Sequence, residues 1–203
     1  MLLLCLFTLN ISSQENKSLE KATVIKNKLI KKSKETSSII TPFTQKKYVS
    51  YMKEPQHSKG IFYYQQNDKM RWEQTSPFKY VLLMNDGKIR IKEKGKEKKV
   101  LATDKMTSQV NSLMLGMING SIFHNKKDFY FKYSSYKDHY IVVLTPKSRQ
   151  LKSRFKSIEL IFSSKTIRLK SLTLNEKSGD KSVMKFFNSK FNEKIKESTF
   201  NTL

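Results

Sequence analysis

The sequence contains few of the residues that form disulfides, metal sites and flexible chains. Its 203 residues include one cysteine, three histidines, six glycines and four prolines. A single cysteine excludes a disulfide framework and a cysteine-rich zinc site, and the scattered histidines leave little material for another metal site. The low glycine and proline content excludes a collagen-like or low-complexity chain. We therefore expect neither a metal ion nor a cofactor.

Acidic residues are also scarce. Only 17 Asp and Glu stand against 40 Lys and Arg, so the formal net charge is +23. Hydrophobic residues nevertheless make up 37% of the chain and aromatic residues 11%, which is enough to build a packed core. The length suits one domain or at most two small ones, and no linker long enough to divide the chain is present.

Sequence motifs of catalysis are absent. The chain has no Gly-x-Ser-x-Gly sequence, no phosphate-binding loop and no dinucleotide fingerprint. The carboxylates are scattered, and no pair of them lies in a clearly apolar setting. We therefore expect a protein that is not an enzyme and has no catalytic residues.

The start of the chain, residues 1–13, resembles the apolar stretch of a secretory signal peptide. It carries no charged side chain, and Ser12 and Ser13 supply small residues near a cleavage site. The apolar run is far too short to span a bilayer, which needs roughly 20 residues. We expect Cys5 to leave with the signal and a mature domain over residues 14–203. No Lys or Arg precedes the run, and a buried first strand or helical turn is the alternative.

Residues 15–36 have the apolar spacing of a helix, which we expect to end before Thr41-Pro42. Its lysines form either a solvated face or a specific binding surface. The apolar stripe consists of Leu19, Ala22, Ile25 and Leu29.

A second helix is predicted over residues 105–119, and Asn119-Gly120 can cap its end. Its apolar face consists of Val110, Leu113, Met114, Met117 and Ile118.

The remaining segments have the texture of short strands, rich in Phe, Tyr, Val and Ile. Asp86-Gly87 between two apolar runs predicts a hairpin, because Gly readily takes the positive φ that such turns need. The pattern predicts one antiparallel sheet system with a long first helix and an inserted second one, and it predicts no element in the tail 195–203. The expected strands are 43–53, 59–66, 69–74, 78–84, 88–93, 128–133, 139–145, 155–163, 166–175 and 181–191.

Large side chains alternate along residues 60–77. Strand periodicity places Phe62, Tyr64 and Gln66 on one face of the first strand. It places Met70 and Trp72 on one face of the next, with Arg71 and Glu73 opposite. Such a face is either ordinary core or, in a sheet that curls without closing, the wall of a cavity for an apolar ligand.

Four short markers carry a family resemblance. Phe43-Thr44-Gln45 follows the first helix, and the two-strand segment from Gly60 to Pro77 has a Trp five residues before its Pro. Asn85-Asp86-Gly87-Lys88 follows as the hairpin, and Leu144-Thr145-Pro146-Lys147 ends a later strand. In this order they resemble the LolA-like family of periplasmic outer-membrane lipoprotein carriers, over residues 43–147 and, with the helices, over most of the chain.

The resemblance implies an α+β fold, a single unclosed antiparallel β-barrel wrapped around an N-terminal helix and an inserted lid helix. It also implies a hydrophobic cavity that shields the acyl chains of lipoproteins between the inner and outer membranes. The implied partners are acylated lipoproteins, an inner-membrane lipoprotein-releasing transporter, and an outer-membrane receptor or anionic membrane surface. We expect a periplasmic monomer that binds no nucleic acid.

The resemblance also implies roles for single residues. Trp72 matches a family aromatic near the cavity, and Met70 replaces an apolar, often aromatic, residue. Gln66 stands where well-studied members carry an Arg that contacts the lid, so the gating of the lid is in question. The expected cavity residues are Phe62, Tyr64, Met70, Trp72, Met114 and Met117.

The charge of +23 has three interpretations. The basic side chains form a solvated surface, attract the protein to anionic headgroups, or bind nucleic acid. The lysines are spread over all parts of the chain, which disfavours the last. Two alternatives to the lipoprotein carrier follow: a carrier of another lipid or glycolipid on the same fold, and a basic module that binds polyanions or nucleic acid.

Overall fold

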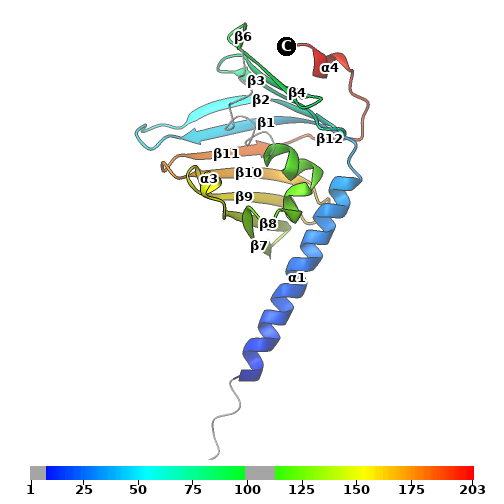
Figure 1. Cartoon of the computed structure of the whole chain (residues 1–203), viewed down its shortest axis with the longest axis vertical. Helices are drawn as coiled ribbons and strands as arrows, with labels where there is room; N and C mark the ends of the chain where they lie inside the picture. Colours follow the sequence, from blue (N-terminus) through cyan, green and yellow to red (C-terminus); the bar gives the residue numbers. More distant parts are fainter. Residues whose placement is uncertain (1–7, 99–112) are drawn as a thin grey trace, which may run out of the picture.

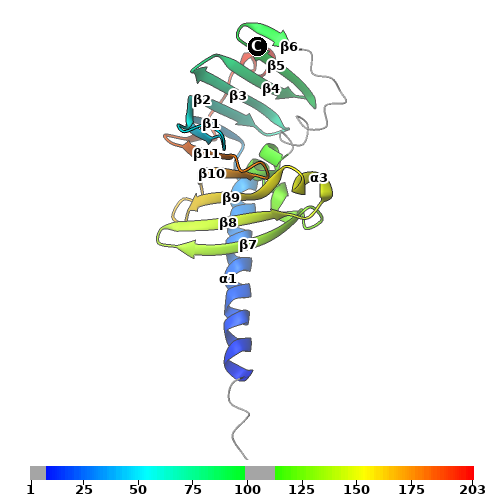
Figure 2. The same cartoon turned by 90° about the vertical axis from the view of Figure 1, so that its left-hand side faces the viewer.

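The computed structural model describes residues 8–98 and 113–203, with side chains from residue 19 onward. Within these residues, a 12-stranded antiparallel sheet has the order β6-β5-β4-β3-β2-β1-β11-β10-β9-β8-β7, with β12 beside β1. The two end strands β6 and β7 do not pair with each other, so the sheet stays open. Figure 2 shows the strands stacked from β6 at the top to β7 at the bottom. The predicted single open antiparallel sheet is confirmed.

Strands from the first half of the chain form one side of the sheet, and strands from the second half form the other. The first set is β1 (Ser38–Tyr48), β2 (Gln56–Gln65), β3 (Lys69–Ser76), β4 (Tyr80–Asn85), β5 (Lys88–Glu93) and β6 (Lys96–Lys98). The second set is β7 (Phe129–Tyr136), β8 (His139–Pro146), β9 (Phe155–Ser163), β10 (Leu169–Glu176), β11 (Lys181–Phe186) and β12 (Lys190–Phe191).

Helix α1 (Thr8–Lys34) begins earlier than the predicted residue 15, and it includes the expected cleavage site near Ser13. Its final turns bury Ile25 and Leu29 against the sheet, as the stripe predicted. Leu19 was expected on the same buried face, but it is 71% exposed. The reason is visible in Figure 1, where the N-terminal part of α1 extends beyond the sheet and has nothing to pack against.

β1 begins before Pro42, whereas the sequence predicted a strand over 43–53. Proline has no N–H to donate to a neighbouring strand. Pro42 lies where β1 changes partner, because β12 pairs at Ile39 and Ile40 and β11 pairs from Phe43 onward. Pro42 still accepts a hydrogen bond here, because the Phe187 N–H donates to the Pro42 carbonyl oxygen at 3.2 Å. This change of partner also divides the predicted strand 181–191 into β11 and β12.

The turn chemistry agrees with the sequence. Asp86 and Gly87 have φ values of 49° and 72°, the left-handed pair that a tight hairpin between β4 and β5 needs. Strands β5 and β9 coincide with the predicted 88–93 and 155–163, and β10 begins at Leu169 rather than at residue 166.

A helical segment over 113–119 and the 3₁₀ helix η1 (Ser121–His124) cover the concave side of the sheet beside the end of α1 (Figure 1). The predicted residues 105–112, including Val110, lie outside the described residues. Gly120 joins the two pieces with φ 79°, and a Cβ there would lie 2.1 Å from Ser33 Oγ of α1. Glycine is therefore required at this position both by its backbone conformation and by the close helix.

Among the described residues, three short helices were not predicted: η1, α3 (Arg149–Lys152) and α4 (Ser198–Asn201). The tail that contains α4 packs on the outer face of the sheet, where Phe200 is 0% exposed beside Leu83 and Ile195. A four-residue helix has too few turns to show a period in the sequence, which explains why the tail was expected to be irregular.

Candidate functional site

The aromatic face predicted from residues 60–77 lies on the inner side of β2 and β3. Phe62 pairs with Trp72, and Tyr64 pairs with Met70, so the four side chains share one face as predicted. Trp72 also contacts Phe43 of β1, with ring centroids 3.9 Å apart. The contact needs a small neighbour, because a Cβ at Gly60 would lie 2.8 Å from Phe43 Cζ and 2.0 Å from the Glu73 carbonyl oxygen.

Arg71 and Glu73 lie on the opposite face, also as predicted. Arg71 Nε donates to Glu73 Oε2 at 2.8 Å, and Arg71 Nη1 donates to the Thr202 carbonyl oxygen at 2.5 Å. The contact with Thr202 fastens the C-terminal tail to the outside of the sheet. The two faces of β3 therefore have separate roles, an apolar interior and a polar attachment.

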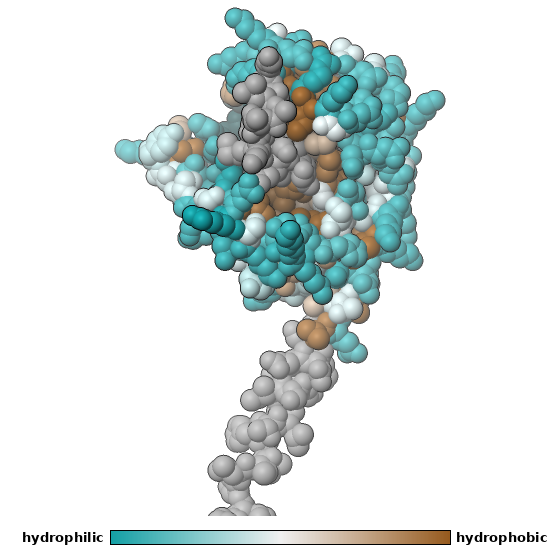
Figure 3. All heavy atoms as spheres, in the orientation of Figure 1, coloured by the Kyte–Doolittle hydropathy of each residue, from teal (hydrophilic) through white to brown (hydrophobic). Residues whose placement is uncertain are grey.

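An apolar cavity of about 90 Å³ lies on the concave side, between the end of α1, the helical segment 113–119 and the middle of the sheet. Figure 3 shows apolar atoms gathered in the middle of this face and hydrophilic atoms around them. The described apolar residues that line the cavity are Leu29, Ile39, Phe62, Met114, Met117, Ile118, Phe123, Phe162, Ile167, Leu169, Leu172, Phe186 and Phe191.

The structure brings three of the predicted cavity residues to this cavity, Phe62, Met114 and Met117. The other three, Tyr64, Met70 and Trp72, belong to an adjoining cluster that also contains Phe62 and packs against Met114. Met70 is 1% exposed and Tyr64 3%, so both are enclosed by packed side chains.

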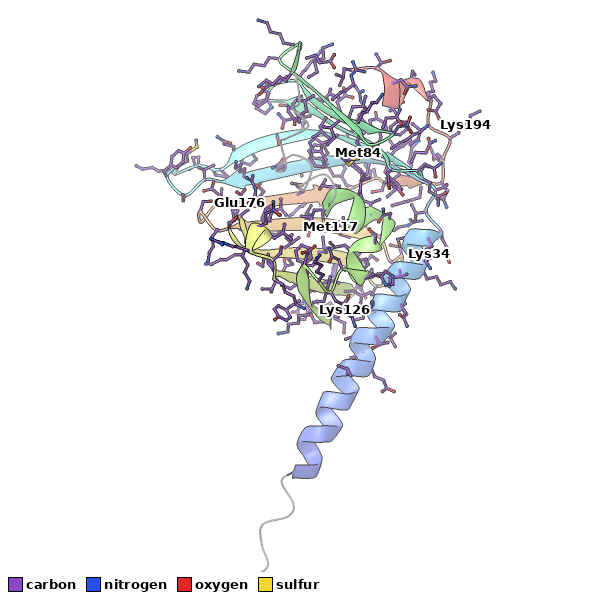
Figure 4. The ribbon with its side chains drawn as sticks, viewed as in Figure 1. Lys34, Met84, Met117, Lys126, Glu176 and Lys194 are labelled. Atoms are coloured by element: carbon purple, nitrogen blue, oxygen red, sulfur yellow. The ribbon has the colours of Figure 1, made fainter. Side chains whose placement is uncertain are left out.

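Two buried methionines lie in different surroundings, one in this cluster and one on the cavity wall. Met84 belongs to the cluster beside Met70 and does not contact the cavity, whereas Met117 lies on its wall. Figure 4 labels both side chains, Met84 on the sheet and Met117 on the covering helical segment. Burial raises the pKa of the Tyr64 hydroxyl, with a smaller contribution from Asp68, so this phenol stays neutral within the cluster.

Part of the cavity wall, called the polar end below, carries polar side chains. Thr36, at the end of α1, is 3% exposed, and Thr41 of β1 is 4% exposed. Thr41 Oγ1 and Ser189 Oγ share a hydrogen bond of 2.7 Å, and Arg168 Nη1 donates to Thr36 Oγ1 at 2.9 Å. The polar lining residues are Lys32, Ser33, Thr36, Thr41, Arg168 and Ser189. The cavity is therefore an apolar chamber whose wall also contains hydroxyl groups and two cations.

Arg168 is the more enclosed of these cations. Its guanidinium lies 3.5 Å from the centroid of the Phe191 ring, a cation–π contact. Burial lowers the pKa of Arg168, and the charge of Glu35 partly opposes that shift. No carboxylate of the described part of the chain forms an ion pair with Arg168, since Glu35 pairs with Lys32 at 3.5 Å.

Ile167, next to Arg168, has a strained backbone. Its φ is 56°, in the left-handed region that a β-branched residue rarely adopts. The conformation is held by two hydrogen bonds across the turn between β9 and β10: Ile167 N–H donates to Ser163 O, and Ser163 N–H donates to Arg168 O, both at 2.9 Å. The turn directs both Ile167 and Arg168 to the cavity lining.

Gln66, the predicted lid contact, is exposed at the end of β2. Its backbone N–H donates to the Ser37 carbonyl oxygen at 2.9 Å, which continues the pairing of β2 with β1 by one residue. Any contact with residues 105–112 of the predicted lid lies outside the described residues.

The sequence did not predict the polar end of the cavity. Thr36 and Arg168 are 132 residues apart, so no local spacing connects them. Lys32 and Arg168 are also two of 40 basic residues, and nothing in the sequence distinguishes them from solvated side chains. The positive φ of Ile167 likewise has no sequence signal, because the pattern predicted a strand there.

Groups suited to metal binding or membrane spanning are not found in the described residues. No set of three His, Cys, Asp or Glu side chains among them lies close enough to hold a metal ion. None of the helices in residues 8–98 and 113–203 has the length and apolar character needed to cross a bilayer.

Solved structures of other proteins have a similar fold. An uncharacterized conserved protein from Thermus thermophilus superposes with a TM-score of 0.54 at 10% identity, over 90% of this chain and 93% of that one. A chain of the MucA/MucB complex of Pseudomonas aeruginosa superposes with a TM-score of 0.51 at 13% sequence identity, over 88% of this chain and 60% of that chain. A LolA superfamily protein from Nitrosomonas europaea superposes with a TM-score of 0.47 at 13% sequence identity, over 89% of this chain and 97% of that one.

Comparison of the sequence with curated proteins gives no match. The sequence profile of one family, described as "Outer membrane lipoprotein carrier protein LolA", matches residues 34–202. That match covers the whole sheet, the helical segment 113–119 and most residues of the cavity wall, whereas Leu29, Lys32 and Ser33 of α1 precede it. The chain therefore belongs to the LolA family.

Proposed function

We propose that the protein is a periplasmic carrier that shields acyl chains of lipoproteins, or of another lipid, on their way from the inner to the outer membrane. The observation that supports this most is the apolar cavity on the concave side of an open sheet, beneath the helical segment 113–119. Membership of the LolA family supports the same role.

The energetics favour such a role. Each CH₂ group removed from water contributes about 0.8 kcal/mol, so an acyl chain needs a shielded route across an aqueous compartment. Shielding requires no covalent chemistry, and we propose no catalytic step. We further propose that the carrier acts as a monomer between an inner-membrane lipoprotein-releasing transporter and an outer-membrane receptor or anionic membrane surface.

The size of the cavity indicates a closed form. Pockets that bind ligands of drug size measure roughly 300–1,000 Å³, well above the 90 Å³ here. Cargo must therefore displace the wall, and the helical segment with Met114 and Met117 is one of the parts of that wall that lie outside the sheet, with the end of α1 and η1. Methionine side chains are flexible and adapt to apolar partners of different shape, which suits a wall that opens.

The test is extraction of the purified full chain with organic solvent, followed by mass spectrometry for acyl lipid. A carrier will yield bound lipid in near-stoichiometric amount, whereas an unrelated basic protein prepared in parallel will not. If no lipid is extracted and a fluorescent fatty acid does not bind, the proposal is wrong. Recovery of the chain from the cytoplasm alone, starting at Met1, would contradict the periplasmic part.

A further inference from the structure

The polar end of the cavity has the features of a headgroup site. Arg168 and Lys32 both line the cavity, and Thr36 connects them, because its hydroxyl accepts from Arg168 Nη1 and donates to the Lys32 carbonyl oxygen. The hydroxyls of Thr41 and Ser189 belong to the same lining. A wall that met only the apolar chains of a cargo would be more stable without a half-buried guanidinium, because burial of charge is costly. Arg168 nevertheless lines the cavity. The preceding residue, Ile167, has a strained backbone with φ 56°, and such strain persists only where the surrounding structure holds the residue in place.

The existing contacts of Arg168 leave room for a further acceptor. A guanidinium has five N–H donors, and in the described residues one of its nitrogens donates to Thr36 Oγ1. The Phe191 ring centroid lies 3.5 Å from the guanidinium carbon, and this cation–π contact supplies no oxygen acceptor to the remaining N–H donors. Two parallel N–H groups of Arg match the two oxygens of a carboxylate or phosphate.

The charge near the site also favours an anion. Lys32 and Arg168 contribute two positive charges, and Glu35 contributes one negative charge through its pair with Lys32 at 3.5 Å. Glu35 is 48% exposed, so its charge is screened more strongly by water than that of a group inside the cavity. The Lys32 side chain is 32% exposed and can turn between Glu35 and a bound anion.

We propose that the cavity binds an acyl amphiphile with an anionic headgroup, a carboxylate or a phosphate, whose oxygens pair with Arg168 while the chain lies against Phe62, Met117 and Leu172. Lys32 is the second cation of the site. This inference rests on the proposed function and makes it narrower, because it assigns the class of lipid and the end of the cavity that holds its headgroup.

The test compares two probes with the same chain, cis-parinaric acid and its uncharged methyl ester, by fluorescence titration of the full chain. A charge-assisted pair predicts that the acid binds about 10-fold more tightly than the ester. In Arg168→Gln the two probes should bind within about 2-fold of each other, at the affinity of the ester. Arg168→Lys should keep part of the preference, because the charge remains and the bidentate geometry is lost.

Lys170→Gln is the matched control. It removes one positive charge from β10, two residues from Arg168, and Lys170 is exposed. The preference for the acid should be unchanged in this variant. Loss of the preference in Lys170→Gln as well would mean that overall charge, and not the headgroup site, determines it, and the inference would be overturned.

The outcomes separate the inference from the proposed function. If acid and ester bind the parent chain equally, the headgroup site is wrong and the carrier role stands. If neither probe binds, the carrier role itself fails. If inorganic phosphate displaces the acid but not the ester, the carboxylate of the acid occupies the anion site, as the inference expects. If phosphate binds and displaces neither probe, the site takes a free anion and the inference is overturned. The parent comparison needs no variant, so the inference remains testable even if Arg168→Gln does not fold.

Discussion

Arg168 Nη1 donates a hydrogen bond of 2.9 Å to Thr36 Oγ1 and so joins the turn between β9 and β10 to the end of α1. Thr36 Oγ1 in turn donates to the Lys32 carbonyl oxygen at 2.8 Å, inside the last turn of the helix. One hydroxyl therefore connects the helix, the cavity and a cation.

Thr36→Val should destabilise the fold. The substitution keeps the shape of the side chain and removes the acceptor, so a half-buried guanidinium loses a partner at a cost of about 1–3 kcal/mol. Trp72, the single tryptophan, reports unfolding by urea through its fluorescence. Thr23→Val is the control, because Thr23 Oγ1 donates to Leu19 O at 3.0 Å on the exposed part of the same helix. Equal losses in the two variants would show that the contact with Arg168 contributes nothing.

Ile167→Asn should leave the stability unchanged or raise it. A left-handed conformation costs an ordinary residue about 1–2 kcal/mol, and Asn tolerates it better than Ile. This gain opposes the loss of a half-buried apolar side chain. Ile161→Asn provides the comparison, because Ile161 is also half-buried but lies in β9, where no such strain exists. We expect a clear loss of the urea midpoint only in the Ile161 variant; the same loss in both would contradict strain at Ile167.

Local chemistry explains which parts of the fold could be predicted. The hairpin at Asp86-Gly87 depends on neighbouring residues only, and β5 and β9 have bounds set by alternation and turn residues nearby. The sharing of one face by Phe62, Tyr64, Met70 and Trp72 follows from the same two-residue period.

The errors have causes that no short window contains. Pro42 lies within β1 because two different strands meet beside it, and both of them come far later in the chain, at Phe186 and Lys190. Leu19 has the right spacing to be buried, but no strand reaches that part of α1. The cations and hydroxyls of the cavity come from α1, β1 and the second half of the sheet, and only the fold brings them together. Sequence periodicity shows which face is apolar, and it does not show where that face is hollow.

The basic surface should produce salt-dependent binding to membranes. Side chains such as Lys165 and Lys190 are 75% and 63% exposed, and each lysine held near an anionic surface contributes about 1 kcal/mol. Screening limits this attraction to about 8 Å at physiological ionic strength. Co-sedimentation with phosphatidylglycerol vesicles should therefore decrease as salt rises, and phosphatidylcholine vesicles should bind little at any salt concentration. Equal binding to both kinds of vesicle would leave the lysines with a solubilising role only.

Two buried methionines provide the sharpest test of the cavity. Met117 is 5% exposed and lies on the cavity wall, and Met84 is 7% exposed in the adjoining packed cluster. Methionine and glutamine have similar length, so Met→Gln mainly adds an amide. A buried amide without a partner costs about 1–3 kcal/mol in protein interiors. Met84→Gln should bear this loss in full, because close-packed neighbours leave no space for water.

Met117→Gln should lose less stability and more binding. Its amide faces a space that can admit a water molecule, which satisfies the amide in the empty protein. A bound acyl chain removes that water and meets the amide directly, so affinity for cis-parinaric acid should fall about 10-fold. Thermal unfolding by circular dichroism and probe titration on the same samples measure both effects. The opposite result would be that Met84→Gln loses binding while it remains folded and Met117→Gln keeps its affinity. The acyl chain would then lie in the adjoining cluster around Phe62, Tyr64 and Met70, and the cavity under the helical segment 113–119 would not be the binding site.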